Sequence, residues 1–389
     1  MRIDGHEAKA ELPGLRVYHV VATGQRRGAE IFAADLIERL AAMGATQRLG
    51  IVRDDYPVSL SFRAPVQQLG ARRRSLPGLR IDPRAAMRLR RELRTFRPTL
   101  VQAHGGEAYK YALAATLGTG VPVVYRRITE VPVAARKGLT RAAHGWLMRR
   151  ADRIVAVADY VRQETTDLFQ VPDELVVTIP GGADPARFRS RAGGRIRREL
   201  GIADDAHVFL SLIALKWEKN PSAHLEVAAR VAARDDRARY LIAGDGPLRS
   251  EVEEEVRARG LAGRVFVLGN RSDVPDLLAA SDAVLLASSL EGMPGCLIEA
   301  GMARLPSVAY DLAGISEVVV HGETGFLVPP GDVEGLAAAL AELFEDEALR
   351  SRLGAAASTR CVGLFDLGAV VEGYANVYRS LERSGGIGS

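Results

Sequence analysis

Short apolar runs alternate with amphipathic helical patterns along the first half of the chain. Apolar runs bounded by turns are typical of strands buried on both faces, and an apolar period of about 3.6 residues is typical of a helix packed on such a sheet. The pattern therefore predicts a parallel sheet covered by helices. The expected strands span residues 15–23, 99–105, 121–126 and 153–158, and the clearest expected helix spans 28–44.

The second half repeats this pattern, and each strand is again followed by a turn and a helical segment. With 389 residues the chain also exceeds the length that one hydrophobic core usually serves. Both halves are therefore predicted to be doubly wound, Rossmann-like α/β domains. The expected strands of the second half span residues 207–214, 238–246, 264–270, 283–289 and 306–311.

A stretch rich in glycine, proline and arginine, residues 179–201, is interpreted as the connection between the two domains. The predicted domains are an N-terminal one over 1–181 and a C-terminal one over 182–365. A last helix within 366–389, capped at Asp366 and followed by a frayed Gly-Ser tail, is expected to pack back toward the N-terminal domain.

Composition narrows the class of protein. The chain is 47% hydrophobic and 26% charged, as in ordinary globular proteins, and no apolar run approaches the roughly 18 residues of a membrane span. Residues 1–14 form a polar lead-in without the apolar core of a signal peptide, so a cytoplasmic protein is expected. Cys296 and Cys361 lack metal-ligand spacing and are interpreted as small buried apolar residues.

Charge is distributed unevenly between the two halves. Residues 1–182 carry 29 Lys and Arg against 18 Asp and Glu, a net charge of +11, whereas the remainder carries 23 against 30, a net charge of −7. Much of the excess lies in the arginine-rich stretch 71–98. A solvated basic helix face explains this stretch, and contact with an anionic membrane or a phosphorylated acceptor is the alternative. Nucleic-acid binding is disfavoured, because no aromatic-basic motif accompanies the charge.

Glycine-containing turns follow many of the expected strands. In open α/β sheets, ligands bind beyond the carboxyl ends of the strands, so these turns are the expected binding surface, and two facing domains would enclose a cleft. Glycine at such a turn lets the backbone approach a ligand closely. The loops span 23–30 and 103–110 in the first domain, and 215–221, 243–249, 268–273, 289–295 and 312–317 in the second.

The stretch SSLEGMPGCLIEAGMARLP predicts a strand end, a tight loop and a helix N-terminus. Gly292 and Gly295 permit unusual backbone angles, and Pro294 suits a first helical turn. The unpaired N–H groups and partial positive charge of such a terminus suit a phosphate or a hydroxylated anionic ligand. Two carboxylates, Glu291 and Glu299, accompany this terminus.

The second half resembles the family 4 glycosyltransferases, retaining enzymes of the GT-B architecture, and the resemblance runs from Val155 to Asp332. Glu291 and Glu299 match the family's glutamate pair with seven intervening residues. The motifs LIAGDGPLR, FVLGNRSD, AGISEVV and HGETGFLVPPGD follow the family in order and spacing. The first domain matches more loosely, through RRGAEIFAADLIERLAAMG, VQAHGG and VPVVY, as expected of a domain that carries a variable acceptor site.

The resemblance implies a nucleotide-sugar donor, with UDP as the expected nucleotide, and no cofactor besides it. Glu299 is expected to bind the ribose hydroxyls, while Glu291 holds the donor sugar. Lys219, with Lys216 near it, is expected to neutralise the departing diphosphate, and Glu291 and Lys219 are the expected catalytic residues. The expected donor-binding residues are Gly28, Lys216, Lys219, Gly244, Gly246, Asn270, Arg271, Glu291, Gly292, Met293, Pro294, Gly295 and Glu299.

The family's favoured mechanism is a front-face substitution in which the departing phosphate takes the acceptor's proton, so no enzymatic nucleophile is assigned. Metal independence is expected, because the paired aspartates of the chain fall in predicted loops or helix ends. The acceptor, a small molecule, glycan or lipid-linked group, is expected at Arg27, His104, Arg126 and Arg127. The basic first domain favours an anionic acceptor or one at an anionic membrane surface.

Three departures from the family pattern leave alternatives open. Ala214 stands where the family usually has an arginine, Arg27 where it has a glycine, and Ile128 where it commonly has a histidine. Lys216 is expected to compensate for the first. A GT-B enzyme of another class, such as a nucleotide-sugar epimerase, phosphorylase or sugar-phosphate synthase, is one competing interpretation, and a non-catalytic glycan-binding relative is another.

Overall fold

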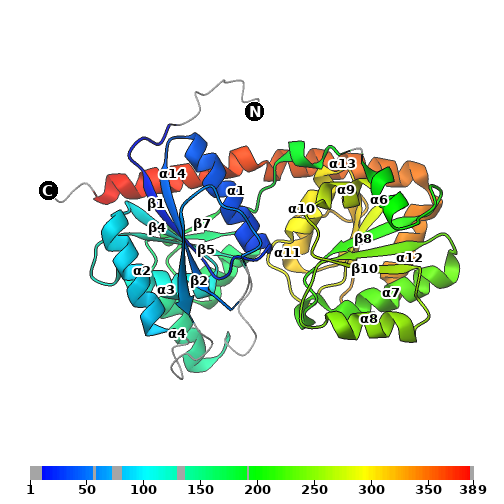
Figure 1. Ribbon diagram of the computed structural model, residues 1–389, viewed down its shortest axis with the longest axis horizontal. Coiled ribbons are helices and arrows are strands. Elements are labelled where there is room, and N and C mark those ends of the chain that lie inside the picture. The colour runs from blue at the N-terminus through cyan, green and yellow to red at the C-terminus, as the bar shows by residue number, and fades with distance from the viewer. Residues whose placement is uncertain (1–10, 56–57, 72–80, 129–135, 191, 386–389) are drawn as a thin grey trace. The chain divides into compact units, whose positions relative to one another are not determined.

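The computed structural model describes residues 11–55, 58–71, 81–128, 136–190 and 192–385 (Figure 1). The chain forms two compact units: unit 1 ends at Gly181 and resumes at Gly368, and unit 2 spans Gly182–Leu367. Three sequence expectations lie outside the described residues: the polar lead-in before residue 11, the arginines at 72–74 and the tail at 386–389. In the part of the chain that is described, no helix is long and apolar enough to cross a membrane.

Unit 1 is built on a seven-stranded parallel sheet in the order β3-β2-β1-β4-β5-β6-β7. The chain winds outward from β1 in one direction and from β4 in the other, so the order reverses between these two neighbours. The strands are β1 Arg16–Val21, β2 Thr46–Arg53, β3 Val66–Ala71, β4 Leu100–His104, β5 Val123–Arg127, β6 Arg153–Ala156 and β7 Val176–Thr178.

Helices cover both faces of this sheet. The connection from β1 to β2 crosses the sheet in one direction, and the connections from β3 onward cross it in the other direction. Because such connections are right-handed, α1 covers one face of the sheet and α2, α3 and α4 cover the other (Figure 1). The last helix, α14, joins the α1 side, where the rings of Phe32 and Tyr374 lie 5.6 Å apart. The helices are α1 Gly28–Ala42, α2 Pro83–Phe96, α3 Gly106–Thr116, α4 Gly138–Met148, α5 Asp159–Gln163 and α14 Leu367–Gly385, with a π-helical turn at Glu164–Leu168.

Unit 2 has a six-stranded parallel sheet in the order β10-β9-β8-β11-β12-β13, with the reversal between β8 and β11. Its strands are β8 Val208–Leu212, β9 Arg239–Ala243, β10 Val265–Gly269, β11 Ala283–Leu286, β12 Ser307–Tyr310 and β13 Gly325–Val328. The helices are α6 Gly193–Glu199, α7 Pro221–Arg234, α8 Arg249–Ala258, α9 Val274–Ala279, α10 Gly295–Met302, α11 Ala313–Ser316, α12 Val333–Glu345 and α13 Glu347–Phe365.

The predicted α/β class with two parallel sheets is confirmed, and every strand expected from an apolar run is present. The central strands β1, β4, β5 and β11 are almost wholly buried, which explains why apolar residues predominate in them. The expected long helix at 28–44 is α1, which ends two residues earlier. Strands β2, β3, β7 and β13, and helix α13, were not predicted.

The stretch 179–201, interpreted as a connection, is largely structured. Two of its backbone bonds tie the segments where the chain crosses between the units: Ala183 N–H donates to Phe365 O at 3.1 Å, and Leu367 N–H donates to Ala183 O at 3.0 Å. Its second half forms helix α6, which packs on α9. The interpretation as a plain linker is therefore wrong for residues after 192, because the apolar Ile196 is fully buried in the core of unit 2.

Two adjacent glycines of α6 offer a test of this packing. A Cβ on Gly193 would lie 2.2 Å from the backbone oxygen of Ala279, whereas a Cβ on Gly194 would meet only the flexible tip of Arg198, at 3.4 Å. Gly193→Ala should lower the free energy of unfolding by about 1–3 kcal/mol through overpacking, and the matched Gly194→Ala should leave it unchanged or raise it. Urea denaturation of both variants measures the difference, and equal midpoints would contradict this packing.

Candidate functional site

The loops that follow β8 and β11 meet where the strand order of unit 2 reverses. Strands β8 and β11 are neighbours, with Leu210 opposite Val284, while the chain continues to β9 on one side and to β12 on the other. The N–H of Ser289 in the second loop donates to the carbonyl of Glu218 in the first, at 3.0 Å. Such a reversal opens a crevice at the carboxyl ends of the strands, where doubly wound sheets bind their ligands.

An ion pair joins these two loops. Lys219 Nζ donates to Glu291 Oε1 at 2.6 Å, and Glu291 is buried, with 7% of its surface exposed. The sequence predicted a diphosphate contact for Lys219 and a sugar contact for Glu291, and the structure joins the two side chains directly. An ammonium group has three donors, so Lys219 can hold Glu291 and a phosphate oxygen at once. The Nζ of Lys216, on the same loop as Lys219, lies 4.0 Å from Glu218 Oε1.

Helix α10 begins at this pair. Pro294 precedes its first residue in an extended conformation and its side chain makes no capping hydrogen bond, and the first-turn N–H groups of this helix lie at the reversal. Glu299 lies on the same helix. Burial, with the charges of Glu291 and Glu299, raises the pKa of the Cys296 thiol to about 12, partly offset by Lys219. The four side chains therefore form one cluster, in which the thiol stays protonated.

Unit 1 has the same arrangement at its own reversal. Strands β1 and β4 are neighbours, and helices α1 and α3 start just beyond them, at Gly28 and Gly106. A Cβ on Gly28 would meet nothing within 4 Å, so this helix start is open. The preceding loop is held by the buried Glu30, whose Oε1 accepts from the hydroxyl of Thr23 at 2.9 Å.

Comparisons with known proteins agree with this geometry. The profile of the family "Glycosyl transferases group 1" matches residues 194–360, and that of "Glycosyltransferase Family 4" matches residues 26–187. The first match spans the reversal of unit 2, and the second begins just after β1 and covers most of unit 1. This chain belongs to these glycosyltransferases.

Relatives and solved structures support the assignment. The chain is 28% identical over 309 residues to the alpha-D-kanosaminyltransferase of Streptomyces kanamyceticus, covering 76% of this chain and 79% of the relative. It is 28% identical over 236 residues to the N-acetyl-alpha-D-glucosaminyl L-malate synthase of Bacillus anthracis, covering 61% of each. Anabaena HepE, solved in complex with UDP and glucose, has a TM-score of 0.80 at 21% identity and covers 94% of this chain and 100% of its own. The fold is therefore GT-B, with two Rossmann-like domains.

A buried histidine of this glycosyltransferase, which the sequence did not single out, positions the Lys219 loop. His224 Nε2 accepts from the N–H of Ala287 at 3.1 Å, so Nδ1 carries the proton that is donated to the carbonyl of Asn220, also at 3.1 Å. Asn220 has a left-handed backbone, with φ 48°, and ends the short turn that contains Lys219. His224 therefore ties the loop after β8 to the end of β11. The only sequence signal was a histidine four residues after Asn220.

Two predicted donor contacts, Gly244 and Gly246, have a structural reason to be glycine. A Cβ on Gly244, whose φ is +144°, would lie 1.8 Å from the backbone oxygen of Ile213, and one on Gly246 would lie 2.3 Å from that of Leu215. We expected these glycines to let the backbone approach a ligand. In the structure, the close neighbour is the backbone of the loop that carries Lys216.

Asn270 and Arg271, two of the expected donor contacts, differ in exposure and in ion pairing. Asn270 is exposed, whereas the guanidinium of Arg271 pairs with Glu199 at 2.6 Å and with Asp273 at 2.7 Å. The hydrogen bonds to Asp273 and Glu199 raise the pKa of Arg271, and Arg271 in turn lowers the pKa of Asp273. The arginine is thus fixed by carboxylates, and its planar face is the part left for stacking.

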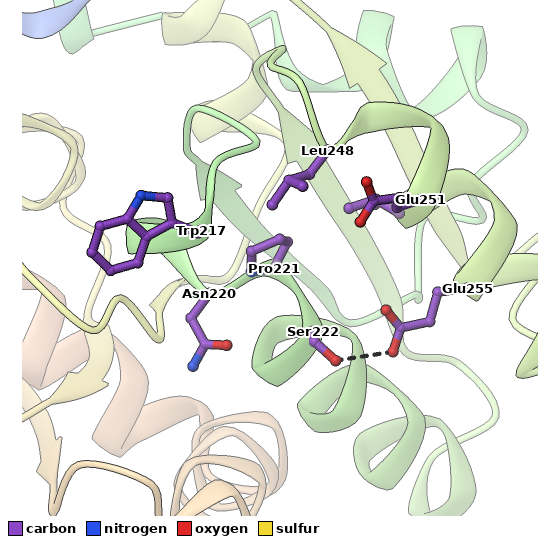
Figure 2. Close-up of a pocket in the computed structure, with 8 residues that line it drawn as sticks. Trp217, Asn220, Pro221, Ser222, Leu248, Glu251 and Glu255 are labelled. Carbon is purple, nitrogen blue, oxygen red and sulfur yellow. Dashed lines mark hydrogen bonds between the residues drawn. The ribbon is translucent and has the colours of Figure 1, made fainter.

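An exposed tryptophan, also missed in the sequence, borders a shallow groove beside the Lys219 turn (Figure 2). The indole of Trp217 is 73% exposed and lies at one end, Pro221 and Leu248 form apolar parts of the lining, and the carboxylate of Glu251 lies on α8 (Figure 2). The groove measures about 230 Å³. Such a lining can accept the apolar face of a ring with polar substituents at its edge.

His104, an expected acceptor contact, is part of a buried chain of hydrogen bonds. His19 Nε2 lies 2.9 Å from Gln47 Oε1, which can only accept, so His19 Nδ1 is the acceptor for the N–H at His104 Nε2, 3.1 Å away. His104 Nδ1 has no hydrogen-bond partner among the described residues. Burial, with the neighbouring His19 and Arg126, holds the pKa of His104 well below its usual value. His104 is therefore neutral and a weak base.

Arg126 and Arg127, two of the expected acceptor contacts, both belong to strand β5 and are buried. Arg127 donates to the carbonyl of Val161 at 2.9 Å and pairs with the carboxylate of Glu164. The positive charge of Arg127 is therefore paired within unit 1, and this ion pair joins β5 to the turn after α5. Arg126 instead lies over the ring of Phe32, 3.9 Å from its centroid.

Two further positions that the sequence singled out, Arg27 and Ile128, lie in unit 1. Arg27 precedes α1, half-buried, and Ile128 lies next to Gly105, whose added Cβ would come within 3.3 Å of Ile128 Cδ1. An apolar side chain thus fills the position where the family commonly has a histidine. Among the described residues, no three His, Cys, Asp or Glu side chains are grouped to hold a metal ion.

The buried His224 makes stability depend on pH in a defined direction. Burial lowers its pKa to about 4, from about 6.5, so below pH 6.5 the unfolded chain takes up a proton that the folded chain does not. The stability contributed by neutral His224 is full above pH 6.5 and is lost as the pH falls toward 4. Between pH 7.5 and 5 this group alone should lower the free energy of unfolding by about 1–2 kcal/mol.

Urea unfolding of the native chain and of His224→Gln at both pH values measures this contribution. His224→Gln should lower stability at pH 7.5 and flatten its pH dependence, whereas a change at the exposed His321 to Gln should leave the dependence as it is. An unchanged slope in the His224 variant would show that this histidine is not held neutral.

Proposed function

We propose that this glycosyltransferase transfers a hexosyl group from a UDP-sugar to a hydroxyl of an acceptor, with retention of configuration at the anomeric carbon. The observation that carries the proposal is the cluster of Lys219, Glu291 and the start of α10 at the reversal of the unit 2 sheet. A cation, a helix N-terminus and two carboxylates within one crevice match the diphosphate, the sugar and the ribose of a single donor.

Each part of the donor has a residue suited to it. Lys219 and the N–H groups at the start of α10 neutralise the diphosphate, and Glu291 accepts hydrogen bonds from the sugar hydroxyls while it holds Lys219 in place. Glu299 accepts two hydrogen bonds from the ribose. UDP is proposed as the nucleotide because Anabaena HepE, which shares this fold, was solved with UDP and glucose.

The proposed reaction needs no side chain that attacks the sugar. The bond between the anomeric carbon and the phosphate oxygen breaks, the acceptor oxygen forms its bond on the same face, and the acceptor's proton passes to the departing phosphate. The protonated thiol of Cys296 and the engaged carboxylate of Glu291 are consistent with this route. A metal-independent reaction is proposed because Lys219 and the helix terminus supply the positive charge that the leaving group requires.

Glu299→Ala should weaken UDP binding by roughly 10- to 100-fold, because two charge-assisted hydrogen bonds to the ribose are lost. Glu291→Gln should leave UDP affinity equal or higher, since Lys219 is released, and should mainly lower turnover. Glu345→Ala, at an exposed glutamate of α12, is the matched control. Calorimetric titration with UDP and turnover of the UDP-sugar, both in excess EDTA, make the measurement.

Unchanged UDP affinity and turnover in both variants would refute the donor assignment. Loss of the native protein's turnover in EDTA, restored by Mg²⁺, would refute the metal-independent part alone. A product without a new glycosidic bond would place the protein among GT-B enzymes of another class, and an absence of any donor turnover with UDP still bound would indicate a non-catalytic relative.

The acceptor is proposed to bind at the strand ends of unit 1 and to carry an anionic group. Arg126 carries this proposal: it is buried, it stacks on Phe32, and although Tyr374 and Glu30 stabilise its charge, no carboxylate forms a direct ion pair with it among the described residues. A buried guanidinium that lacks a direct ion pair is only partly compensated, so an acceptor anion would complement it. The synthase relative from Bacillus anthracis, by its name, joins a sugar to L-malate, which is such an anion.

Arg126→Gln should raise the acceptor KM at least tenfold and leave the donor KM within twofold, because it removes one charge-assisted contact on the acceptor side alone. Arg63→Gln, at an exposed arginine of unit 1, is the control. Initial rates at about 0.05 and 0.5 M salt should show the acceptor KM rising with ionic strength in the native protein. An acceptor KM that responds neither to salt nor to Arg126→Gln would favour a neutral acceptor.

A further inference from the structure

Large exposed apolar side chains gather on one helical layer of unit 1. Leu139 is 91% exposed and Trp146 is 54% exposed, both on α4, and Met87 on α2 and Leu117 at the end of α3 are exposed as well. Isolated exposed apolar residues are common on protein surfaces, but a group of them on adjacent elements marks an interaction surface.

Three apolar side chains form a stripe along α4, in which residues 138–143 are all exposed. Leu139, Ala143 and Trp146 follow one another at helical spacing, and all three are exposed. The opposite side, with Gly145 and Met148, is buried. Gly145 packs so closely that an added Cβ would lie 2.4 Å from the backbone oxygen of Phe169. The helix is thus anchored at its C-terminal end, while the end that carries Leu139 stands clear of the unit.

Positive charge surrounds this apolar stripe. Residues 137–150 include four basic side chains and no acidic one: Lys137, Arg141, Arg149 and Arg150. The guanidinium of Arg150 lies 4.5 Å from the centre of the Trp146 ring. An indole flanked by arginines is suited to the boundary between lipid head groups and acyl chains, where its ring is apolar and its edge is polar.

The neighbouring α2 extends the basic surface. Its buried side is formed by Leu89, Leu93 and Phe96, and its outward side carries Met87 among exposed arginines. Those arginines are Arg84, Arg88, Arg91 and Arg94. For the arginine-rich stretch 71–98, the sequence allowed two explanations, a solvated helix face or contact with an anionic partner. The helix in this stretch combines exposed arginines with one exposed apolar side chain, Met87.

Hydrogen bonds hold these helices in one layer. Arg90 of α2 donates to the carbonyl of Leu117 at 2.7 Å, and Tyr109 of α3 donates to the carbonyl of Leu147 in α4, also at 2.7 Å. Because α2, α3 and α4 cover the same face of the sheet, their outward sides are turned the same way (Figure 1). The apolar stripe of α4 and the arginines of α2 thus belong to one side of unit 1.

We propose that this side of unit 1 binds the surface of an anionic lipid bilayer, with Leu139 and Trp146 entering the interface and the arginines of α4 and α2 contacting the head groups. Charge complementarity selects an anionic surface, and the exposed apolar stripe selects a bilayer over a purely polyanionic partner. The proposal concerns where the enzyme works and is independent of the donor chemistry.

The chain has two tryptophans, Trp146 and Trp217, which allows a direct test. In a Trp217→Phe background, vesicles containing about a third phosphatidylglycerol should shift the Trp146 emission to shorter wavelength, and brominated acyl chains should quench it. In the matched Trp146→Phe background, the Trp217 emission should not respond. Phosphatidylcholine vesicles should have little effect on either.

Co-sedimentation with the same anionic vesicles measures how strongly the protein binds to them. Each basic side chain near such a surface strengthens binding about fivefold, so Lys137→Gln with Arg141→Gln should weaken it roughly 25-fold. Leu139→Ala should weaken it on the order of tenfold. Leu364→Ala, at an exposed leucine of α13, should leave it unchanged. These side chains are exposed, so the variants should fold like the native chain.

Binding that is equal to anionic and zwitterionic vesicles, or that survives both the charge and the Leu139 changes, would overturn the proposal. So would an emission shift of Trp146 produced equally by RNA without vesicles, because the surface would then be a site for soluble polyanions.

Discussion

The contact between Lys219 and Glu291 joins the two loops on which the donor site depends. The loops meet because β8 and β11 are adjacent in the sheet although more than seventy residues separate them in the sequence. A charge pair with one partner buried is costly unless it is well formed, and breaking it leaves a buried carboxylate unpaired. The pair therefore fixes the distance between the loop that supplies the cation and the helix start that supplies the N–H groups.

Several other features hold the loops that make this contact. His224, neutral because it is buried, connects the carbonyl before α7 with the N–H that follows β11. Gly244 and Gly246 lack side chains because the backbone that leads to Lys219 passes directly against them. A site whose charged groups are held by packing and backbone hydrogen bonds needs little rearrangement when a charged ligand arrives, which is the condition under which electrostatic stabilisation is most effective.

The sequence predicted the parts of this enzyme that repeat a local pattern. Buried strands such as β1 and β11 are mostly apolar, so they could be recognised from the sequence, and Glu291 and Glu299 could be singled out because they lie in a motif of fixed spacing. Strand β3 has exposed polar residues and β7 has three residues, so neither carries a clear period. The ion pairs of Arg127 and Arg271 could not be predicted, because their partners are brought near only by the tertiary fold.

Hydrogen exchange on the intact chain, with and without UDP, tests the central claim most directly, because it reports on backbone N–H groups at the proposed site. We expect UDP to slow exchange in the turn at Trp217–Lys219 and at the start of α10, with smaller effects elsewhere in unit 2. UDP binding that leaves both segments unprotected, or that protects the groove between α7 and α8 instead, would contradict it.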